Sequence, residues 1–429
     1  MSNSALIRKA IQSGSVEDLK HVIETVPYQV LSETGYTPLM LAIHLGPTIV
    51  KKDEVFKMIL DWEPDINRKD IDGYSAFSYA TSLHRIEFIK ILLERDVDVN
   101  VPCITTVAPH FRAYDAYKNS IHSAHTLKYP ISTRHQMSPL SMAIYRSYDY
   151  LVPIMVEKGA DLNAVGGLDI TPLSMAVRSQ KDDMVGYLLE CGADPNVLPK
   201  NWREYAQNPK DVCPVALKKA IKYGEATAIS LLIQAGSNVP SLFPRKDNLY
   251  STPLTYLFSQ PVAQLSEPFT CFSMLREYCK ITDFDSLKRS PLSYAVENHI
   301  ADYVLPYLFD EKVNNSPDVY HVTPMMYAYQ SRYFKAMDML YHQGVPMANQ
   351  MDTVRGRNLL MHSLSHNDVE MVNFLLQYNP NLLQKDKKGR TILYYVRGRE
   401  DSLATKIKEL YKAQSEKIVQ HVKQKKMDV

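Results

Sequence analysis

The stretch "DITPLSMAVRSQKDDMVGYLLECGADPN", residues 169–196, decides the fold, because the chain carries a second version of it just upstream. That version is "MSPLSMAIYRSYDYLVPIMVEKGADLN", residues 137–163, and Thr171 stands 33 residues after its counterpart Ser138. A constant period of this length is typical of proteins built from one small repeated unit. The 429 residues are therefore expected to form an array of similar units rather than several unrelated domains.

Each copy of the stretch predicts two short helices joined by a turn. The hydroxyl of Thr171 can cap the first helix, and Pro172 fits its first position because an N–H there would have no helical partner. In the second helix, "MVGYLLE" at 184–190 places its apolar residues on one side. Gly192 follows where a helix end often needs a left-handed residue. The repeated unit is therefore predicted to be a helical hairpin.

Openings that match this template recur along almost the whole chain. They lie at Ala5, Thr37, Ser75, Ser138, Thr171, Val215, Thr252, Ser290, Thr323, Asn358 and Thr391. The motif "TPL" with a following Ala at 171–176, and the closing "GAD-x-N" at 159–163 and 192–196, resemble the ankyrin repeat family. The resemblance implies an all-α fold, an α-solenoid of about eleven ankyrin-like helical hairpin repeats with short β-hairpin or loop connections.

Unequal intervals between the openings predict where extra segments lie. The interval from Ser75 to Ser138 is 63 residues, which is one unit and a long insertion. The predicted organisation is an N-terminal capping repeat at 1–33, ankyrin-like repeats at 34–100, a His- and Tyr-rich insertion at 101–136, ankyrin-like repeats at 137–196, a short insertion at 197–211, ankyrin-like repeats at 212–400 and a basic amphipathic C-terminal capping helix at 401–429. Insertions in repeat arrays map to loops, and long loops are often functional.

Composition and motifs argue against several functional classes. A net charge of +2 gives no global attraction to nucleic acid or membranes. The chain has no glycine-rich phosphate loop and no Gly-x-Ser-x-Gly nucleophile elbow. Its five cysteines include no close Cys-x-x-Cys pair, which predicts reduced thiols rather than disulfides or a zinc ribbon. We therefore expect no catalytic activity and no cofactor, in a chain that is monomeric by itself.

The sequence also indicates a location. The first twenty residues hold no apolar run long enough for a signal peptide, and no window approaches the roughly 18 apolar residues of a membrane span. A cytoplasmic protein is expected. Secretion into a host cytosol without a cleavable signal peptide is left open.

A row of tyrosines is the first candidate for a binding surface. The fifth position of the opening motif is tyrosine in five units, at Tyr79, Tyr256, Tyr294, Tyr327 and Tyr395. Equivalent positions of stacked hairpins fall in a row, so these rings are expected to lie side by side. They could simply fill space between units, or they could present hydroxyl edges to a partner in the concave groove.

The two insertions supply further candidates. The shorter one carries Trp202, one of the two tryptophans of the chain, which could contact a partner. In the longer one, His122 and His125 are spaced so that both could ligate one metal ion on a helix. Because their spacing matches no established zinc pattern, a polar loop without metal is the favoured interpretation.

Basic residues gather in the turns of the last units. They are Arg355, Arg357, Lys387, Lys388 and Arg390, with Lys385, Arg397 and Arg399 nearby. The tail that follows has seven lysines and two glutamates from Leu403 to Lys426, with a helical apolar stripe. Sealing the last repeat is its favoured role, because terminal repeats need a polar outer face. Docking to an acidic protein, an anionic membrane or nucleic acid through this basic end is the alternative.

The function expected from these observations is a non-catalytic scaffold or adaptor. It would bind another protein through the concave repeat surface and the loop insertions. One alternative is a host-directed effector or regulatory subunit with a metal-dependent or modifying activity in 101–136. A second is a tether that uses the basic C-terminal end. The resemblance also implies that a closing asparagine can be hydroxylated by an oxygenase, and Asn100 in "LLERDVDVN" has a similar setting. An unmodified asparagine that makes hydrogen bonds in the hairpin is the favoured interpretation.

Overall fold

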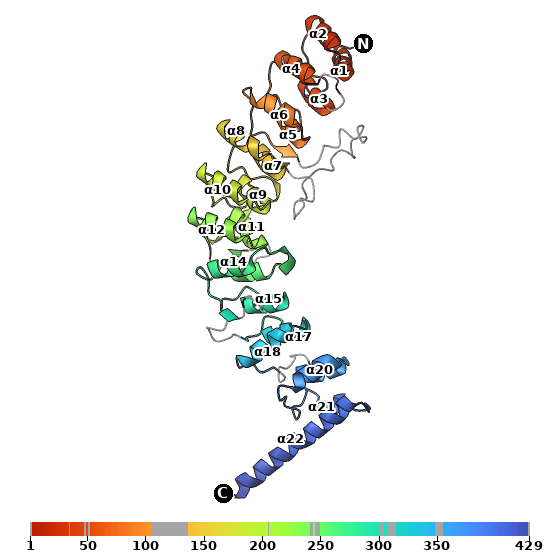
Figure 1. Ribbon diagram of the computed structural model, residues 1–429, viewed down its shortest axis with the longest axis vertical. Coiled ribbons are helices and arrows are strands. Elements are labelled where there is room, and N and C mark those ends of the chain that lie inside the picture. Colours follow the sequence, from red (N-terminus) through yellow and green to blue (C-terminus); the bar gives the residue numbers. More distant parts are fainter. Residues whose placement is uncertain are drawn as a thin grey trace. The chain divides into compact units, whose positions relative to one another are not determined.

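The computed structural model describes residues 2–33, 35–46, 49, 52–104, 136–204, 206–240, 243–244, 249–300, 304, 306–307, 315–347 and 355–427. The chain divides into two compact units, Met1–Val239 and Pro240–Val429. Each unit is a stack of helical hairpins, and successive hairpins in the stack lie side by side (Figure 1). Each unit is therefore an all-α solenoid, as the repeated motif predicts.

Six helical pairs are described in the first unit. They are α1 (Asn3–Ser13) with α2 (Val16–Thr25), α3 (Pro38–Leu45) with α4 (Lys52–Trp62), α5 (Ala76–Ser82) with α6 (Ile86–Leu93), α7 (Pro139–Tyr145) with α8 (Val152–Glu157), α9 (Pro172–Arg178) with α10 (Asp182–Glu190), and α11 (Val215–Tyr223) with α12 (Ala226–Gln234). The first helices pack on one another from repeat to repeat, as α7, α9 and α11 do. They form the inner layer of this unit.

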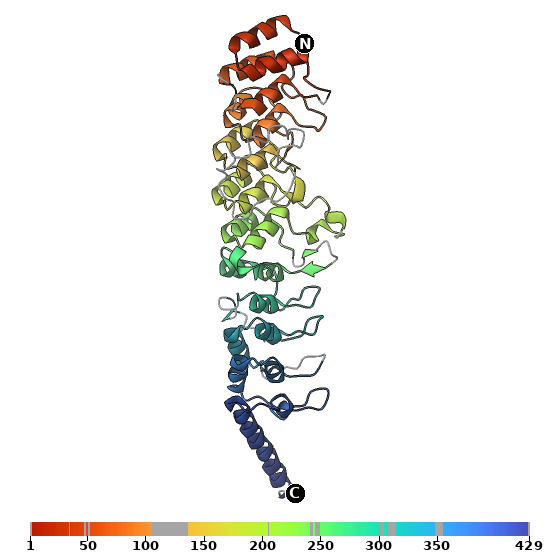
Figure 2. The ribbon, with the colours of Figure 1, turned by 90° about the vertical axis from the view of Figure 1, so that its right-hand side faces the viewer.

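The second unit repeats the arrangement in its described residues. Its helices are α13 (Pro253–Phe258), α14 (Pro268–Leu275), α15 (Pro291–Glu297), α17 (Pro324–Gln330), α18 (Phe334–His342), α19 (Leu359–Ser365), α20 (Val369–Leu376), α21 (Ile392–Tyr395) and α22 (Ser402–Met427). Between the hairpins run extended turns that project from one side of the helices of this unit (Figure 2).

The first helices begin where the motif predicts, and for the predicted reason. In α9, the Thr171 hydroxyl accepts a hydrogen bond from the Ser174 N–H at 3.0 Å, and the Ser174 hydroxyl accepts one from the Thr171 N–H at 2.8 Å. A cap side chain that accepts a backbone N–H occurs at Thr37, Ser75, Ser138, Thr171, Thr252, Ser290, Thr323 and Asn358. Each cap satisfies an N–H that the helix cannot bond itself.

Two predicted openings need correction. The first helix is capped by Ser2, whose Oγ accepts from the Ala5 N–H at 3.3 Å, so Ala5 lies inside α1. Val215 is the first residue of α11, and Pro214 stands at its cap position without a side-chain bond. Thr391 stands at the cap position of the four-residue helix α21, as predicted, but makes no side-chain cap bond. Ala5 and Val215 both lack the "TPL" motif, so the sequence carries no local signal for the first residue of these helices.

Short β pairs connect some hairpins. Strand β1 (Cys103–Ile104) pairs antiparallel with β2 (Gln136–Met137), and β3 (Phe243–Pro244) pairs with β4 (Tyr250–Ser251). Val101 and Cys103 are 1% and 0% exposed, so the start of the predicted 101–136 insertion belongs to the core. Residues 105–135, the remainder of that insertion, lie outside the described residues.

The two terminal helices cover the ends of their units. In α1, Ile7, Ala10 and Ile11 are buried on the inner side. In α22, Leu403 and Ile407 are 8% and 0% exposed, and burial ends about two turns into the helix. The amide of Gln414 fixes α22 to the preceding loop by accepting from the Leu382 N–H and donating to the Pro380 carbonyl, at 3.0 and 2.8 Å. The first half of α22 thus packs on the preceding residues, whereas Ile418 and Val419 beyond it are 54% and 51% exposed. Its role as a capping helix stays a prediction.

Candidate interaction surface

A carboxylate in the turn before the first helix organises four of the repeats. The aspartate lies five residues before the cap, and one of its oxygens accepts two backbone N–H bonds that close the turn. Its other oxygen accepts the hydroxyl of the tyrosine at the fifth motif position. The pairs are Tyr79 with Asp70, Tyr294 with Asp285, Tyr327 with Asp318 and Tyr395 with Asp386, at 2.6, 2.7, 2.6 and 2.7 Å. The turn is thereby fastened to the helix that follows it.

The turn of Asp318 shows the arrangement in full. Its Oδ1 accepts the N–H groups of Tyr320 and Val322 at 2.8 and 2.9 Å, and its Oδ2 accepts the Tyr327 hydroxyl. Asp318 is 4% exposed and Tyr327 is 8% exposed. Burial and the hydrogen bond to the carboxylate raise the pKa of Tyr327 well above its usual value. The hydroxyl is therefore a committed donor to the turn.

Arg289 links the tyrosines of two consecutive repeats. Its guanidinium carbon lies 3.8 Å from the ring centroid of Tyr294 and 4.2 Å from that of Tyr327, and it forms an ion pair with Glu297. The cation is therefore stacked between two aromatic rings, which stabilises it more than an exposed ion pair would. This contact confirms that tyrosines at equivalent positions lie side by side in this part of the chain.

The tyrosine row is structural where it is buried. Tyr79, Tyr294 and Tyr327 are 5%, 8% and 8% exposed, and their hydroxyls are held by aspartates. A partner that contacts these three hydroxyls would have to displace the carboxylates, so the space-filling interpretation is favoured, and a role of these tyrosines in partner binding stays a prediction. Tyr256 and Tyr395 are half-buried, and the Tyr256 ring lies edge-on to Phe243 at 5.9 Å.

The predicted cations of the last repeats have different surroundings. Lys387, Lys388 and Arg355 are exposed, and the Lys387 N–H donates to the Arg355 carbonyl at 3.1 Å, so two turns meet there. Arg357 is only 8% exposed and donates from Nη1 to the Ser365 hydroxyl at 2.8 Å. Arg390 is half-buried against Asp386. Burial opposes ionisation of Asp386, but the bonds from Tyr395 and Arg390 outweigh it and hold its pKa well below the usual range.

Trp202 lies in a short 3-10 helix, Trp202–Glu204, within the second insertion. Its ring is half-buried, and the guanidinium of Arg203 lies 4.7 Å from the ring centroid. The insertion is tied back to the preceding repeat, since the Lys200 N–H donates to Asp169 Oδ1 at 2.9 Å. Trp202 is thus an aromatic on a fastened loop, and its role in partner binding stays a prediction.

Large apolar side chains at the turns were missed by the sequence interpretation. In the first unit Ile71 and Leu168 are 70% and 54% exposed. In the second unit Tyr250, Val319 and Tyr320 are 47%, 42% and 68% exposed. A signal was available, because Ile71 and Val319 directly follow the turn aspartate, where a solvated turn would carry polar residues.

Backbone hydrogen bonds join the turns of the second unit into one row. The Ser286 N–H donates to the Tyr250 carbonyl at 3.0 Å, and the Val319 N–H donates to the Leu287 carbonyl at 2.9 Å. We call the surface formed by Tyr250, Leu287, Val319 and Tyr320 the turn ridge. It combines the exposed side chains of Tyr250, Val319 and Tyr320 with the half-buried Leu287, on a backbone that is hydrogen-bonded from turn to turn. Such an arrangement is suitable for binding another protein.

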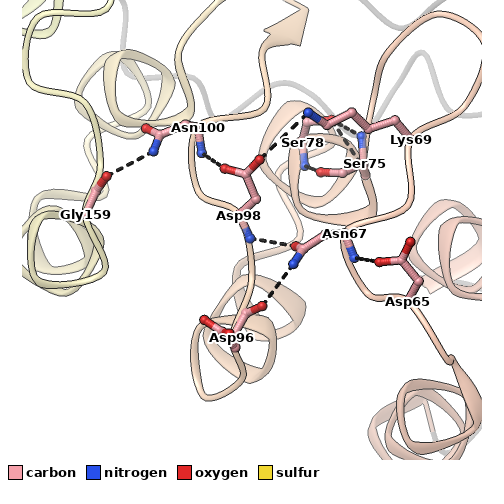
Figure 3. Close-up of polar contacts among 9 residues, drawn as sticks. All are labelled: Asp65, Asn67, Lys69, Ser75, Ser78, Asp96, Asp98, Asn100 and Gly159. Carbon is pink, nitrogen blue, oxygen red and sulfur yellow. Dashed lines mark hydrogen bonds and ion pairs between the residues drawn. The ribbon is translucent and has the colours of Figure 1, made fainter.

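On the first unit, asparagines link one repeat to the next (Figure 3). Asn67 accepts the Asp98 N–H at 2.6 Å and donates to the Asp96 carbonyl at 3.1 Å. Asn100 repeats the pattern one unit later by donating to the Gly159 carbonyl at 2.9 Å. The side-chain oxygens of Asn163 and Asn196 each accept a backbone N–H from the next repeat, as that of Asn67 does. Asn100 is exposed, and its amide already makes a hydrogen bond between two repeats. Its hydroxylation stays a prediction.

Replacing Asn196 by Ala is expected to lower the free energy of unfolding by about 1–2 kcal/mol, because two bonds between repeats are lost. These bonds join its amide to the Asn238 N–H at 2.7 Å and to the Gly236 carbonyl at 3.0 Å. Chemical denaturation and amide exchange at Asn238 would measure the effect. Asn201→Ala, in an exposed part of the insertion, is the matched control and should change stability by less than about 0.5 kcal/mol. Equal effects of the two substitutions would contradict a linking role.

In the described part of the chain, no observation supports a metal site or a membrane-spanning helix. His122 and His125 lie outside the described residues, and within these residues no group of three or more His, Cys, Asp or Glu side chains is placed to hold a metal ion. Among the described helices, none combines the length and the apolar character needed to cross a bilayer.

Comparison with known families agrees with the geometry. A family model for ankyrin repeats in three copies matches residues 3–103, and a model for a single ankyrin repeat matches residues 168–197. None of the curated proteins compared with the chain matches it. The matched segments contain the hairpins α1 to α6 and α9 to α10, whose capped first helices and asparagine links repeat along the first unit. The chain therefore contains ankyrin repeats, in residues 3–103 and 168–197.

Proposed function

We propose that the chain is a non-catalytic scaffold that binds a partner protein through the turn ridge. Ankyrin repeats generally mediate protein–protein interaction. The observation that carries the proposal is the exposure of Val319 and Tyr320, at 42% and 68%, on a turn whose backbone is held by Asp318. Such a surface loses little conformational entropy when it binds, because its backbone is already ordered.

The test compares crosslinking from the ridge and from a position away from it. A photoreactive benzoylphenylalanine is placed at position 320, and in a matched variant at Val369, which begins α20 and is 44% exposed. The proposal expects one protein to crosslink from position 320 and not from position 369. The paired substitution of Val319 and Tyr320 by Ser should abolish its co-purification with the intact chain. A partner that crosslinks equally from both positions, or that still co-purifies with the Ser variant, would overturn the ridge as the binding surface.

A further inference from the structure

The turn before α21 has the same backbone as the turn ridge but carries lysine in place of an apolar side chain. Asp318 and Asp386 close equivalent turns, because each lies five residues before the opening of its repeat. The Tyr320 N–H donates to Asp318 Oδ1 at 2.8 Å, and the Lys388 N–H donates to Asp386 Oδ1 at 2.9 Å. Tyr320 and Lys388 are therefore equivalent residues on equivalent turns.

Both turns are also hydrogen-bonded to the turn of an earlier repeat. The Val319 N–H donates to the Leu287 carbonyl at 2.9 Å, and the Lys387 N–H donates to the Arg355 carbonyl at 3.1 Å. The turns of the second unit project from one side of its helices (Figure 2). The row of turns that contains the turn ridge therefore includes the turn before α21, with the same kind of backbone contact.

The surface of this last turn is basic. Lys385 and Lys388 are exposed. The carboxylate between them, that of Asp386, is 5% exposed, and its Oδ2 accepts hydrogen bonds from the Tyr395 hydroxyl and from Arg390 Nε at 2.7 and 2.8 Å. Its Oδ1 accepts backbone N–H groups of the turn. The negative charge of the turn is thus directed inward, whereas the two lysines face solvent.

The repeat pattern gives the distance between the apolar and the basic part of this row. Tyr320 precedes α17 and Lys388 precedes α21, with the repeat of α19 between them. Packed helices lie about 8–10 Å apart, so equivalent positions two repeats apart are separated by roughly 16–20 Å. An extended chain rises about 3.3 Å per residue, so about five or six residues cover this distance.

We propose that this row of turns binds an extended acidic segment of a partner protein. An apolar side chain of the segment contacts Val319 and Tyr320, and Asp or Glu side chains about five or six residues away pair with Lys385 and Lys388. The inference rests on the proposed function, because it uses the turn ridge, and it adds the chemistry and the spacing of the bound segment. A peptide supplies both kinds of group, whereas a polyphosphate chain would match the lysines and leave Val319 without an apolar contact.

Peptide selection on the full-length chain tests this pairing. A displayed library of random 12-residue peptides is selected on the intact chain, and synthetic copies of the selected peptides are titrated onto three variants. The lysine variant combines Lys385→Gln with Lys388→Gln. The matched control combines Lys412→Gln with Lys417→Gln, which removes the same charge from exposed positions on α22. The third is the paired Ser variant of the turn ridge described above, and thermal unfolding would verify that all three fold.

The intact chain should select peptides that have an aromatic or aliphatic residue and, about five or six positions from it, Asp or Glu. These peptides should bind the lysine variant about 5- to 10-fold more weakly, as expected for the loss of two exposed ion pairs. The difference should shrink at high salt, because exposed charges are screened. The control should bind the peptides as the intact chain does.

The outcomes separate this inference from the proposed function. Peptides that lose affinity for the Ser variant but bind the lysine variant as tightly as the intact chain would overturn the basic contact and leave the proposed function in place. An equal loss in the lysine variant and the control would also overturn it, because overall charge would then cause the attraction. Peptides that bind the Ser variant undiminished, or failure to select any peptide, would count against both.

Phosphatidylserine vesicles and a single-stranded DNA are the remaining probes. The proposal expects neither to distinguish the lysine variant from the control. If either probe binds the control and not the lysine variant, while the peptides bind both equally, the basic turn serves a membrane or a nucleic acid, and the acidic segment is the wrong partner.

Discussion

Replacing Asp318 by Ala is expected to lower the free energy of unfolding of the second unit by about 3–4 kcal/mol. The change removes three hydrogen bonds at once and leaves the N–H groups of Tyr320 and Val322 without their acceptor. Each bond to a charged group contributes about 1.5–3 kcal/mol, and water that enters the opened turn recovers part of the loss. Denaturant unfolding of the full chain, followed by amide exchange in α17, would measure the effect.

The substitution Tyr327→Phe measures the contribution of the hydroxyl bond to stability separately from that of the backbone bonds in the turn. It removes only the donor to Asp318 and keeps the ring beside Arg289, so a loss of about 1–2 kcal/mol is expected. The double variant should lose less than the sum of the two single changes, since both act on one network. If Asp318→Ala costs no more than Tyr327→Phe, the carboxylate does not organise the turn as described.

The sequence predicts the fold well because its signals are local. A hydroxyl followed by Pro, Leu and a later Ala specifies a capped helix within six residues, and the structure has that cap at Thr37, Thr171 and Thr323, for example. Where the local signal was incomplete, as at Ala5 and Val215, the predicted helix start was displaced or its cap was missing.

The role of the tyrosines could not be settled from their own positions. A tyrosine at a fixed place in each repeat is compatible with a groove-facing ring and with a buried one. What decides between them is an aspartate nine residues earlier, as for Asp318 and Tyr327. That pairing is present in the sequence as a second periodic feature, so a search for co-occurring Asp and Tyr could have found it.

The sequence predicts which residues of the last repeats are basic, but it does not predict which of them are exposed. Lys387, Lys388 and Arg355 are exposed, whereas Arg357 is buried, although all four look alike in the sequence. The difference depends on which turn residues face the neighbouring repeat, and that is a property of the stack.

Replacing Ile407 by Asp is expected to lower the stability of the last repeats by about 3–4 kcal/mol, through a lost apolar contact and a buried carboxylate without a partner. Ile407 is 0% exposed, on the half of α22 that is fixed by Gln414. Because each repeat is stabilised mainly by its neighbours, loss of the cap should spread inward. Amide exchange should therefore rise in α20 and α21 and remain unchanged in α13.

Ile418→Asp is the matched control on the same helix. Ile418 is 54% exposed and lies beyond Gln414, so the same substitution should change stability by less than about 0.5 kcal/mol. A comparable loss from both variants would mean that the whole of α22 packs on the repeats. An unchanged exchange pattern in Ile407→Asp would mean that α20 and α21 hold together without a cap. The contrast between the two isoleucines thus tests whether one helix combines a capping half with a half that is free to make other contacts.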